Sequence, residues 1–189
     1  MSEPAKQWYM ACLDLEGRSV LVVGGGPVAL EKVHGLLACG AKVTVVAPRI
    51  EPELRALDVE WLARRYQRDD LAGRFLVVAA TSNTGVNTAV HQDAERRHLF
   101  CNVVDVPELC SLILPAVHRQ GPIAVAVSTG GASPALAQRI RTQIGEEIGP
   151  EYAQLARQLQ ALRPWAKRNL SSYEDRRAYF ERLVEEALA

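Results

Sequence analysis

The sequence predicts an α/β protein whose first half forms a parallel, doubly wound sheet and whose last part is helical. Three observations support this prediction. Short β-rich runs alternate with helical segments through the first half of the 189-residue chain, which is the pattern of βαβ units. Residues 18–23 are almost continuously apolar, as in a strand that is covered on both faces. The sequence after Ser133-Pro134 is helical in character to its end.

The expected elements follow one another in a regular order. Strands are expected, in chain order, over residues 18–23, 41–46, 60–66, 75–81 and 99–105, the third being the most polar. Helices are expected over about 27–39 and 85–98, and Gly40 stands where a helix commonly ends. A helix separates the first strand from the second and the fourth from the fifth, so the sheet is expected to be parallel.

The alternation of strands and helices ends after residue 110. Apolar runs over 110–117 and 122–128 are separated only by residues 118–121, so no helix lies between them. We therefore expect the two runs to pair as antiparallel strands. The remaining helical part is expected to be interrupted at 149–150 and at 169–172.

Composition excludes several classes of protein. Hydrophobic residues make up 48% and charged residues 23%, and 22 basic residues balance 22 acidic ones. With this balance the chain lacks the net positive charge that would attract nucleic acid or an anionic membrane surface. No basic and apolar leader opens the sequence, and its apolar runs are too short to span a bilayer. The four cysteines show no C-x-x-C spacing, so we expect buried thiols at Cys39 and Cys101 and a cytoplasmic protein.

A glycine-rich turn follows the first strand, because residues 24–29 read G-G-G-P-V-A at the start of a helix. They fit the pattern G-x-G-x-x-A, in which Gly24 allows the tight turn, Gly26 admits a pyrophosphate and Ala29 lets the helix pack on the sheet. The helix N-terminus would bind the phosphates, because its N–H groups and dipole favour anions. The pattern predicts a dinucleotide site, with a purely structural turn as the alternative.

The acidic residue that usually binds the ribose is missing. It is expected near the end of the second strand, ~20 residues after the glycines, where this chain has Val46-Ala47-Pro48-Arg49. Arg49 could pair with the 2′-phosphate of NADP or be a solvated surface residue, and the backbone of 47–49 could hold the ribose. The turn therefore does not choose between NAD and NADP.

Asp105 ends the expected strand over 99–105. Ligands of open α/β sheets bind outside the carboxyl ends of the strands, and a carboxylate at that place can exchange a proton with a substrate. A helix cap or a turn before Val106-Pro107 explains the residue equally well.

A second dense turn has the sequence S-T-G-G-A-S-P over 128–134, and its residues 133–134 are suited to open a helix. Two glycines and three hydroxyls before a helix can present several N–H donors to a carboxylate or phosphate. Arg139 and Arg141 follow within two turns, and Arg119 lies between the two antiparallel runs. We expect an anion-binding surface or, alternatively, a capped helix with solvated arginines.

Together these stretches resemble the precorrin-2 dehydrogenases of sirohaem synthesis, a family that also forms the N-terminal module of multifunctional sirohaem synthases. The resemblance covers roughly residues 10–145, in the family's order. The matching stretches are 22–29 with Lys32, 79–81 with 86–87, 101–105, 115–117 with Arg119, and 126–137 with Arg141. The last two are far more specific than the glycine turn.

The resemblance implies oxidation of precorrin-2 to sirohydrochlorin with NAD as the cofactor, and in some members the insertion of Fe²⁺ as a further substrate. It also implies a homodimer that takes a small tetrapyrrole, with neither nucleic acid nor a membrane as partner. The chain is accordingly expected to contain an NAD-binding Rossmann domain (1–112), a dimerisation segment of hairpin strands and a helix (113–147) and a helical C-terminal domain (148–189).

Single residues take their expected roles from the same resemblance. The family's essential aspartate falls on Asp105, as general base, and its active-site serine falls on Ser128. The residues expected to bind substrate are Ser128, Arg119, His118, Thr129, Gly130 and Arg141. The residues expected to bind the dinucleotide are Gly24, Gly26, Pro27, Val28, Pro48, Arg49 and Thr81. The substrate's carboxylates would give the arginines an anionic partner.

Four positions depart from the family's pattern. Val106 stands where a second acid is common, Leu112 where a phenylalanine is, and Ser82-Asn83 where an acidic pair is. The loss of carboxylates weakens the expectation of a chelatase, for which Asp105 is the one metal ligand that we assign. Two alternatives to a dehydrogenase are an NAD(H)-sensing domain without turnover and a protein that is chiefly a metallochelatase.

Overall fold

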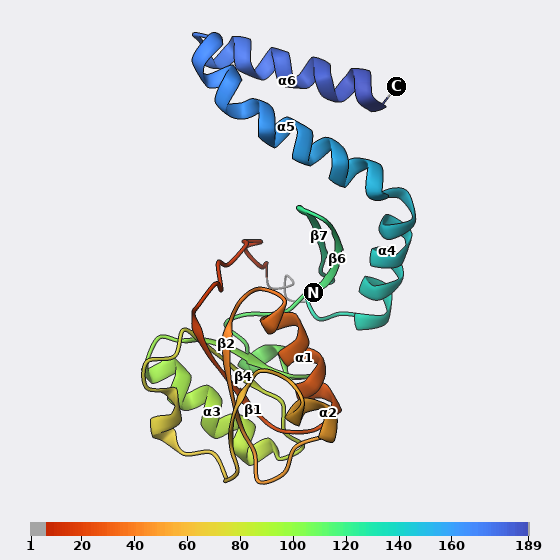
Figure 1. Cartoon of the computed structure of the whole chain (residues 1–189). Helices are drawn as coiled ribbons and strands as arrows, with labels where there is room; N and C mark the ends of the chain where they lie inside the picture. Colours follow the sequence, from red (N-terminus) through yellow and green to blue (C-terminus); the bar gives the residue numbers. More distant parts are fainter. Residues whose placement is uncertain (1–6, 189) are drawn as a thin grey trace. The chain divides into compact units, whose positions relative to one another are not determined.

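The computed structural model describes residues 7–188. Within them the chain forms two compact units (Figure 1). The Rossmann unit is Trp8–Leu114, and the hairpin–helix unit contains Gln7 and the chain from Pro115 onward. Asp105 and the residues expected to bind the dinucleotide therefore belong to the first unit, and those expected to bind substrate belong to the second.

Five parallel strands form the sheet of the Rossmann unit, in the order β3-β2-β1-β4-β5. They are β1 (Ser19–Val23), β2 (Lys42–Val46), β3 (Glu60–Leu62), β4 (Leu76–Ala79) and β5 (Phe100–Val103). The register sets Val46, Val23, Ala79 and Val103 level with one another. The strand ends therefore meet at one edge, and the order reverses between β1 and β4, the switch point at which such sheets bind ligands.

Helices cover both faces of this sheet (Figure 1). α1 (Pro27–Leu37) and α2 (Pro52–Arg55) pack on one face with side chains such as Val22, and α3 (Thr84–Arg96) packs on the other with side chains such as Leu21. Successive strand residues thus enter two separate buried clusters, which explains the continuous apolar runs. Each fully buried Val or Leu contributes about 1.5–3 kcal/mol.

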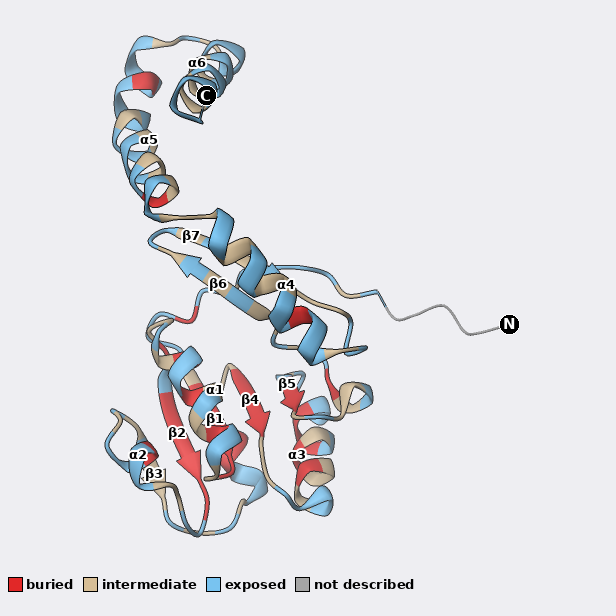
Figure 2. Cartoon of the chain, turned by 90° about the vertical axis from the view of Figure 1, so that its right-hand side faces the viewer, coloured by how far each residue is buried: buried red, intermediate tan, exposed pale blue. Residues whose placement is uncertain are grey.

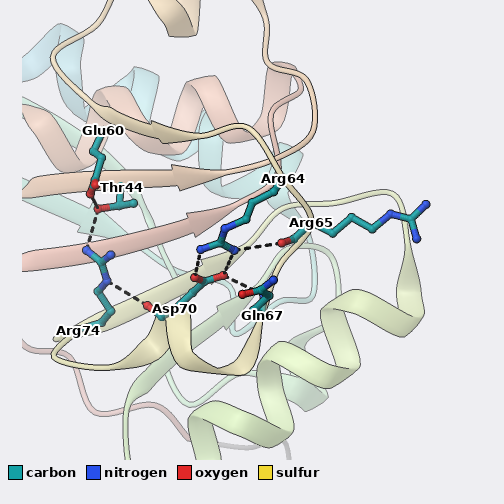
Figure 3. Close-up of polar contacts among 7 residues, drawn as sticks. All are labelled: Thr44, Glu60, Arg64, Arg65, Gln67, Asp70 and Arg74. Atoms are coloured by element: carbon teal, nitrogen blue, oxygen red, sulfur yellow. Dashed lines mark hydrogen bonds and ion pairs between the residues drawn. The ribbon is translucent and has the colours of Figure 1, made fainter.

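The third strand is shorter than the expected 60–66, because the chain beyond Leu62 forms polar contacts instead of extending the sheet (Figure 3). Arg64 donates through both terminal nitrogens to the buried carboxylate of Asp70, which also accepts from the N–H of Gln67 at 2.8 Å. Burial raises the pKa of Asp70, but the hydrogen bonds and the charge of Arg64 outweigh it, so the net shift of that pKa is downward.

The hairpin–helix unit opens with the antiparallel pair β6 (Ala116–Gln120) and β7 (Ile123–Val127). The expected pairing is confirmed, but the expected turn over 118–121 is wrong. Gln120 pairs with Ile123, so the turn is only Gly121-Pro122, and His118 and Arg119 lie in β6. Gly121 has a φ of 58°, as glycine does at the first position of a two-residue hairpin turn.

Three helices complete the second unit, namely α4 (Pro134–Glu147), α5 (Pro150–Asn169) and α6 (Tyr173–Leu188). Their breaks fall where the sequence predicts them. None of the helices within residues 7–188 is long and apolar enough to cross a membrane. The parallel sheet, the antiparallel pair and the helical tail together confirm the predicted fold class.

All four cysteines are free thiols. Cys101 is buried as expected, whereas Cys39 is half-buried, because α1 ends at Leu37 and leaves it in the following turn. Burial raises the pKa of the Cys101 thiol to about 12. Cys101 is therefore a neutral packing group at physiological pH.

Candidate functional site

Loops that follow β1, β2 and β4 converge at the carboxyl edge of the sheet. The N–H of Gly24 donates to the carbonyl of Val46 at 3.0 Å, and the N–H of Glu51 donates to the carbonyl of Gly25 at 2.8 Å. The N–H of Ala80 donates to the carbonyl of Val23 at 2.8 Å. The glycine turn is therefore fixed to both neighbouring loops by backbone hydrogen bonds.

The three glycines of the turn serve different purposes. Gly24 has a φ of 131°, and a Cβ there would lie 2.2 Å from the carbonyl oxygen of Ala80. A Cβ on Gly25 would lie 2.1 Å from the carbonyl oxygen of Arg49. Gly26 has an ordinary φ of −89°, and a Cβ there would meet no described heavy atom within 4 Å. The fold thus requires Gly24 and Gly25, whereas Gly26 leaves open space for a ligand.

The N-terminus of α1 borders this open space. Gly26 is its N-cap, no side chain caps the helix, and its first turn carries no acidic residue. Pro27 and Val28 follow and are exposed. Uncapped N–H groups and the helix dipole suit an anion such as a pyrophosphate. The residues present therefore fit a dinucleotide.

The loop after β2 forms another side of the site. Pro48 and Arg49 are exposed, and beyond them an open pocket is lined by Ile50, Pro52, Arg55 and Ala56. The Arg55 guanidinium stacks 4.6 Å from the ring centroid of Trp61. Of the two expected residues in this loop, Arg49 is the one that offers a charged side chain to an anion.

Thr81, in the loop after β4, uses its side chain within the protein. Its hydroxyl donates to Oδ1 of Asn87 at 2.7 Å and accepts from the N–H of Asn83 at 3.1 Å. Asn87 Nδ2 donates to the Thr81 carbonyl at 2.9 Å, and Asn83 caps α3. Thr81 therefore holds the loop beside Gly24. Asn87 lies in a stretch that carries the family resemblance, whereas Asn83 is indicated only by the ability of asparagine to cap a helix.

Asp105 lies two residues past β5, at the same edge of the sheet. It is exposed, and its φ of 60° is in the left-handed region, which is uncommon for a residue with a side chain. The N–H of Val106 closes the turn on the carbonyl of Val103 at 3.3 Å. The following 3₁₀ helix, η2 (Pro107–Leu109), has no side-chain cap. A helix-capping role for Asp105 is therefore not observed, and its carboxylate faces solvent.

The S-T-G-G-A-S-P turn joins β7 to α4. Ser133 caps α4 by accepting from the N–H of Leu136 at 3.2 Å, as expected. The Thr129 hydroxyl bonds both the carbonyl and the N–H of Ser133, at 3.1 and 3.0 Å. Ser128 accepts from the N–H of Gly130 at 3.1 Å, and Gly130 has a φ of 64°. All three hydroxyls of the turn therefore shape the loop itself.

The remaining expected substrate residues are distributed over β6 and α4. His118 Nε2 lies 3.2 Å from the carbonyl oxygen of Ile148, just past the end of α4. Its Nδ1 would lie 2.9 Å from a Cβ on Gly145, so both ring nitrogens face α4. Arg119 is exposed on β6, and Arg141 donates to Gln138 Oε1 at 2.9 Å. In residues 7–188 no three His, Cys, Asp or Glu side chains form a group that could hold a metal ion.

Comparison with known proteins finds two matching families along the chain. The family described as "Putative NAD(P)-binding" matches residues 11–116, and the family described as "Sirohaem biosynthesis protein central" matches residues 120–147. A siroheme synthase of Thioalkalivibrio sulfidiphilus is 44% identical over 182 residues, which is 94% of this chain and 37% of the relative. Siroheme synthase 2 of Aeromonas hydrophila is 44% identical over 170 residues, which is 89% of this chain and 36% of the relative.

The solved structure of SirC, a precorrin-2 dehydrogenase, is similar over nearly its whole length. It has a TM-score of 0.80 and 30% sequence identity, and the alignment covers 96% of this chain and 93% of SirC. The chain spans only 37% and 36% of the length of the two siroheme synthases. These matches, which agree with the resemblance carried by the motifs, show that the chain belongs to the family of sirohaem-biosynthesis proteins that includes SirC precorrin-2 dehydrogenase and the siroheme synthases.

Proposed function

We propose that this chain oxidises precorrin-2 to sirohydrochlorin with NAD⁺ as the hydride acceptor. The observation that carries the proposal is the similarity to SirC precorrin-2 dehydrogenase over nearly the full length of both chains. An NAD-sensing domain needs only the glycine turn. It has no need of the segment over 120–147, which matches the sirohaem family in its own right.

The dinucleotide is proposed to bind across the carboxyl edge of the Rossmann sheet. Gly26 and the N-terminus of α1, with Pro27 and Val28, would take the pyrophosphate. Gly24 holds the turn in place. Pro48 and Arg49 would lie along the adenosine ribose, with Thr81 supporting the loop on the other side of the turn. The absence of a ribose-binding acid leaves this contact to the loop after β2.

Asp105 is proposed to accept the proton that leaves with the hydride. NAD⁺, when bound, supplies the redox chemistry by accepting two electrons with one hydrogen. The second hydrogen leaves the substrate as a proton, for which a solvent-facing carboxylate at the same sheet edge is a suitable base. General-base catalysis of this kind contributes roughly 10²–10⁴-fold to a rate.

Residues of the hairpin–helix unit are proposed to bind the carboxylates of the tetrapyrrole. Arg119 and Arg141 supply positive charge, and Ser128, Thr129 and Gly130 supply a loop with two glycines in the left-handed region. His118 has an indirect part in this proposal, because its ring faces α4 and so holds β6 against that helix.

We further propose a cytoplasmic homodimer. The hairpin–helix unit exposes large apolar side chains at Leu136, Trp165 and Tyr173, and a second copy of the chain is the proposed partner. Four free thiols suit a reducing compartment. Sedimentation of the purified chain tests this proposal. A homodimer should give a molecular mass twice the 20.7 kDa of one chain.

Iron insertion is a second candidate activity, favoured by relatives that are named siroheme synthases. Fe²⁺ would then be a substrate, and Asp105 the proposed ligand. Anaerobic incubation of sirohydrochlorin with Fe²⁺ in the absence of NAD⁺ tests this activity separately. Formation of sirohaem above the rate without protein would support it, and an unchanged rate would contradict it.

The dehydrogenase proposal is tested by anaerobic turnover. Purified protein is mixed with enzymatically generated precorrin-2 and either NAD⁺ or NADP⁺, and the absorbance of sirohydrochlorin is followed. We expect product with NAD⁺, at a rate proportional to the protein concentration. Tight binding of NAD⁺ without any product would contradict the proposal and favour the sensing domain.

A further inference from the structure

The outer edge of β5 is covered by the segment Cys110–Leu112 of the same chain. Ser111 Oγ accepts from the N–H of Cys101 at 2.9 Å, and the N–H groups of Ser111 and Leu112 donate to the Cys101 carbonyl at 3.0 and 3.1 Å. Asn102 Nδ2 donates to the Leu112 carbonyl at 3.0 Å. These contacts satisfy backbone groups that an edge strand would otherwise expose.

The thiol of Cys110 continues this cover up to the turn that carries Asp105. Its sulfur accepts from the N–H of Val103 at 3.2 Å. Its hydrogen can be donated to the carbonyl of Val103 or to that of Val106, at 3.2 and 3.4 Å. Cys110 is only 6% exposed. A single buried thiol therefore contacts both ends of the turn Val103–Val106.

This turn needs support, because Asp105 sits in it with a positive φ. At the third position of a turn such a conformation favours glycine or asparagine over other residues. A side chain held in this region persists where the surrounding structure determines it, and such positions cluster at functional sites. The Val106–Val103 hydrogen bond closes the turn, and the Cys110 thiol holds its two ends.

We propose that Cys110 is a positioning residue for the general base: its thiol holds the turn Val103–Val106 and thereby orients the Asp105 carboxylate. The catalytic part of this inference rests on the proposed function. Cys110 does not itself touch substrate or cofactor. Misplacement of a catalytic group by 1 Å can cost on the order of 10²-fold in rate, so loosening this turn slows the reaction without weakening cofactor binding.

The chain offers a matched control in Cys101. Both thiols are buried, and both lie at β5, but no hydrogen bond of the Cys101 side chain to the Asp105 turn is found among the described residues. Replacement of either cysteine by alanine removes one buried sulfur. Only Cys110→Ala removes the contacts to Val103 and Val106. Cys110→Ser keeps a donor and an acceptor at the same place.

Two readouts on the full chain test the proposal. The first is steady-state kinetics. Cys110→Ala lowers kcat roughly tenfold and leaves KM for NAD⁺ within about twofold of the wild-type value. Cys101→Ala keeps kcat within about twofold of the wild-type value. Cys110→Ser recovers at least about a third of the lost kcat. The second is amide hydrogen exchange by NMR, in which the amides of Val103 and Val106 exchange faster in Cys110→Ala than in Cys101→Ala, relative to the core amide of Leu21.

The two readouts separate this proposal from the proposed function. Equal kcat values for Cys110→Ala and Cys101→Ala, or unchanged exchange at Val103 and Val106, would overturn the positioning role. An inactive wild-type protein would overturn the proposed function and with it the catalytic part of the inference. In that event the exchange rates alone still decide whether the thiol holds the turn.

Discussion

The two units of this chain differ most in how much of each is buried (Figure 2). In the Rossmann unit, residues Val20–Val23 of β1 are at most 2% exposed, and β4 is buried throughout. In the described part of the hairpin–helix unit, the buried residues are Ala137, Ala153 and Ala166. The first unit therefore has a core of branched side chains. In the described part of the second unit, the side chains that are buried between its strands and helices are those of alanines.

The difference shows two ways of building a site. In the Rossmann unit a buried sheet presents backbone groups and glycines at its carboxyl edge, where the dinucleotide is proposed to bind. In the hairpin–helix unit, side chains such as Thr129 and Ser133 fix the loop that carries the proposed substrate residues. Substitutions should therefore affect folding in the first unit and local geometry in the second.

The largest expected effect separates the three glycines. Gly24→Ala and Gly25→Ala place a Cβ about 2 Å from a backbone carbonyl oxygen, so each should lower the free energy of unfolding by about 3 kcal/mol or more. Gly26→Ala should change it by less than about 0.5 kcal/mol and yet weaken NAD⁺ binding. Urea unfolding and calorimetric titration measure the two quantities. Equal destabilisation by all three would refute the division of roles.

A second prediction compares leucines of the two units. Leu21 is 0% exposed and Leu136 is 52% exposed. Leu21→Ala should lower the free energy of unfolding by about 2–5 kcal/mol, whereas Leu136→Ala should change it by less than about 0.5 kcal/mol. Thermal unfolding of the two variants is the measurement. A large loss for Leu136→Ala in protein dilute enough to be monomeric would contradict its exposed position. A loss that appears only as the protein concentration rises is what the proposed homodimer predicts.

A third prediction concerns His118 and Gly145. Gly145→Ala should cost about 1–2 kcal/mol, because the new Cβ meets the imidazole ring at 2.9 Å. In a His118→Ala background the same change should stabilise the protein by about 0.5–1 kcal/mol, since alanine is the better helix former. A double-mutant cycle of unfolding free energies measures the reversal of sign. Additive effects would mean that the ring does not press on α4.

The smallest expected effect depends on pH. The pKa of Asp70 is lowered in the folded protein, so its carboxylate stabilises the fold above its unfolded pKa of about 3.9. That contribution disappears as the pH falls below about 4 through the folded value. The Tm difference between wild type and Asp70→Asn should therefore be present at pH 7 and shrink as the pH approaches 3. A Tm difference that grows as the pH falls would contradict the downward shift of the Asp70 pKa.

Much of the Rossmann unit could be predicted from the sequence. β1, α1 and β2 lie within two residues of their expected bounds, because apolar runs and glycines mark both ends of each element. β3 and the hairpin turn were predicted less well. The Arg64–Asp70 contact that follows β3 joins residues six apart, and no apolar or polar alternation marks it. The Gly121-Pro122 turn lets β6 extend over residues with polar side chains.

The sequence indicates candidate site residues but not the geometry in which the fold holds them. Gly24 and Gly26 fit the pattern, but the requirement for Gly25 comes from the Arg49 carbonyl, which only the folded loop brings near. The left-handed backbone of Asp105 has no local sequence signal. The hydrogen bond from the N–H of Val103 to the Cys110 sulfur forms because the segment 110–112 folds back beside β5. Neither residue spacing nor composition indicates it.

The most direct test of the central claim is anaerobic turnover of precorrin-2 by Asp105→Asn, measured beside Glu108→Gln, an exposed neighbouring carboxylate on η2. If Asp105 is the base of an NAD-dependent dehydrogenase, Asp105→Asn binds NAD⁺ like the wild type but forms sirohydrochlorin roughly 10²–10⁴-fold more slowly, while Glu108→Gln keeps the wild-type rate. Turnover by Asp105→Asn at the rate of Glu108→Gln would contradict the claim.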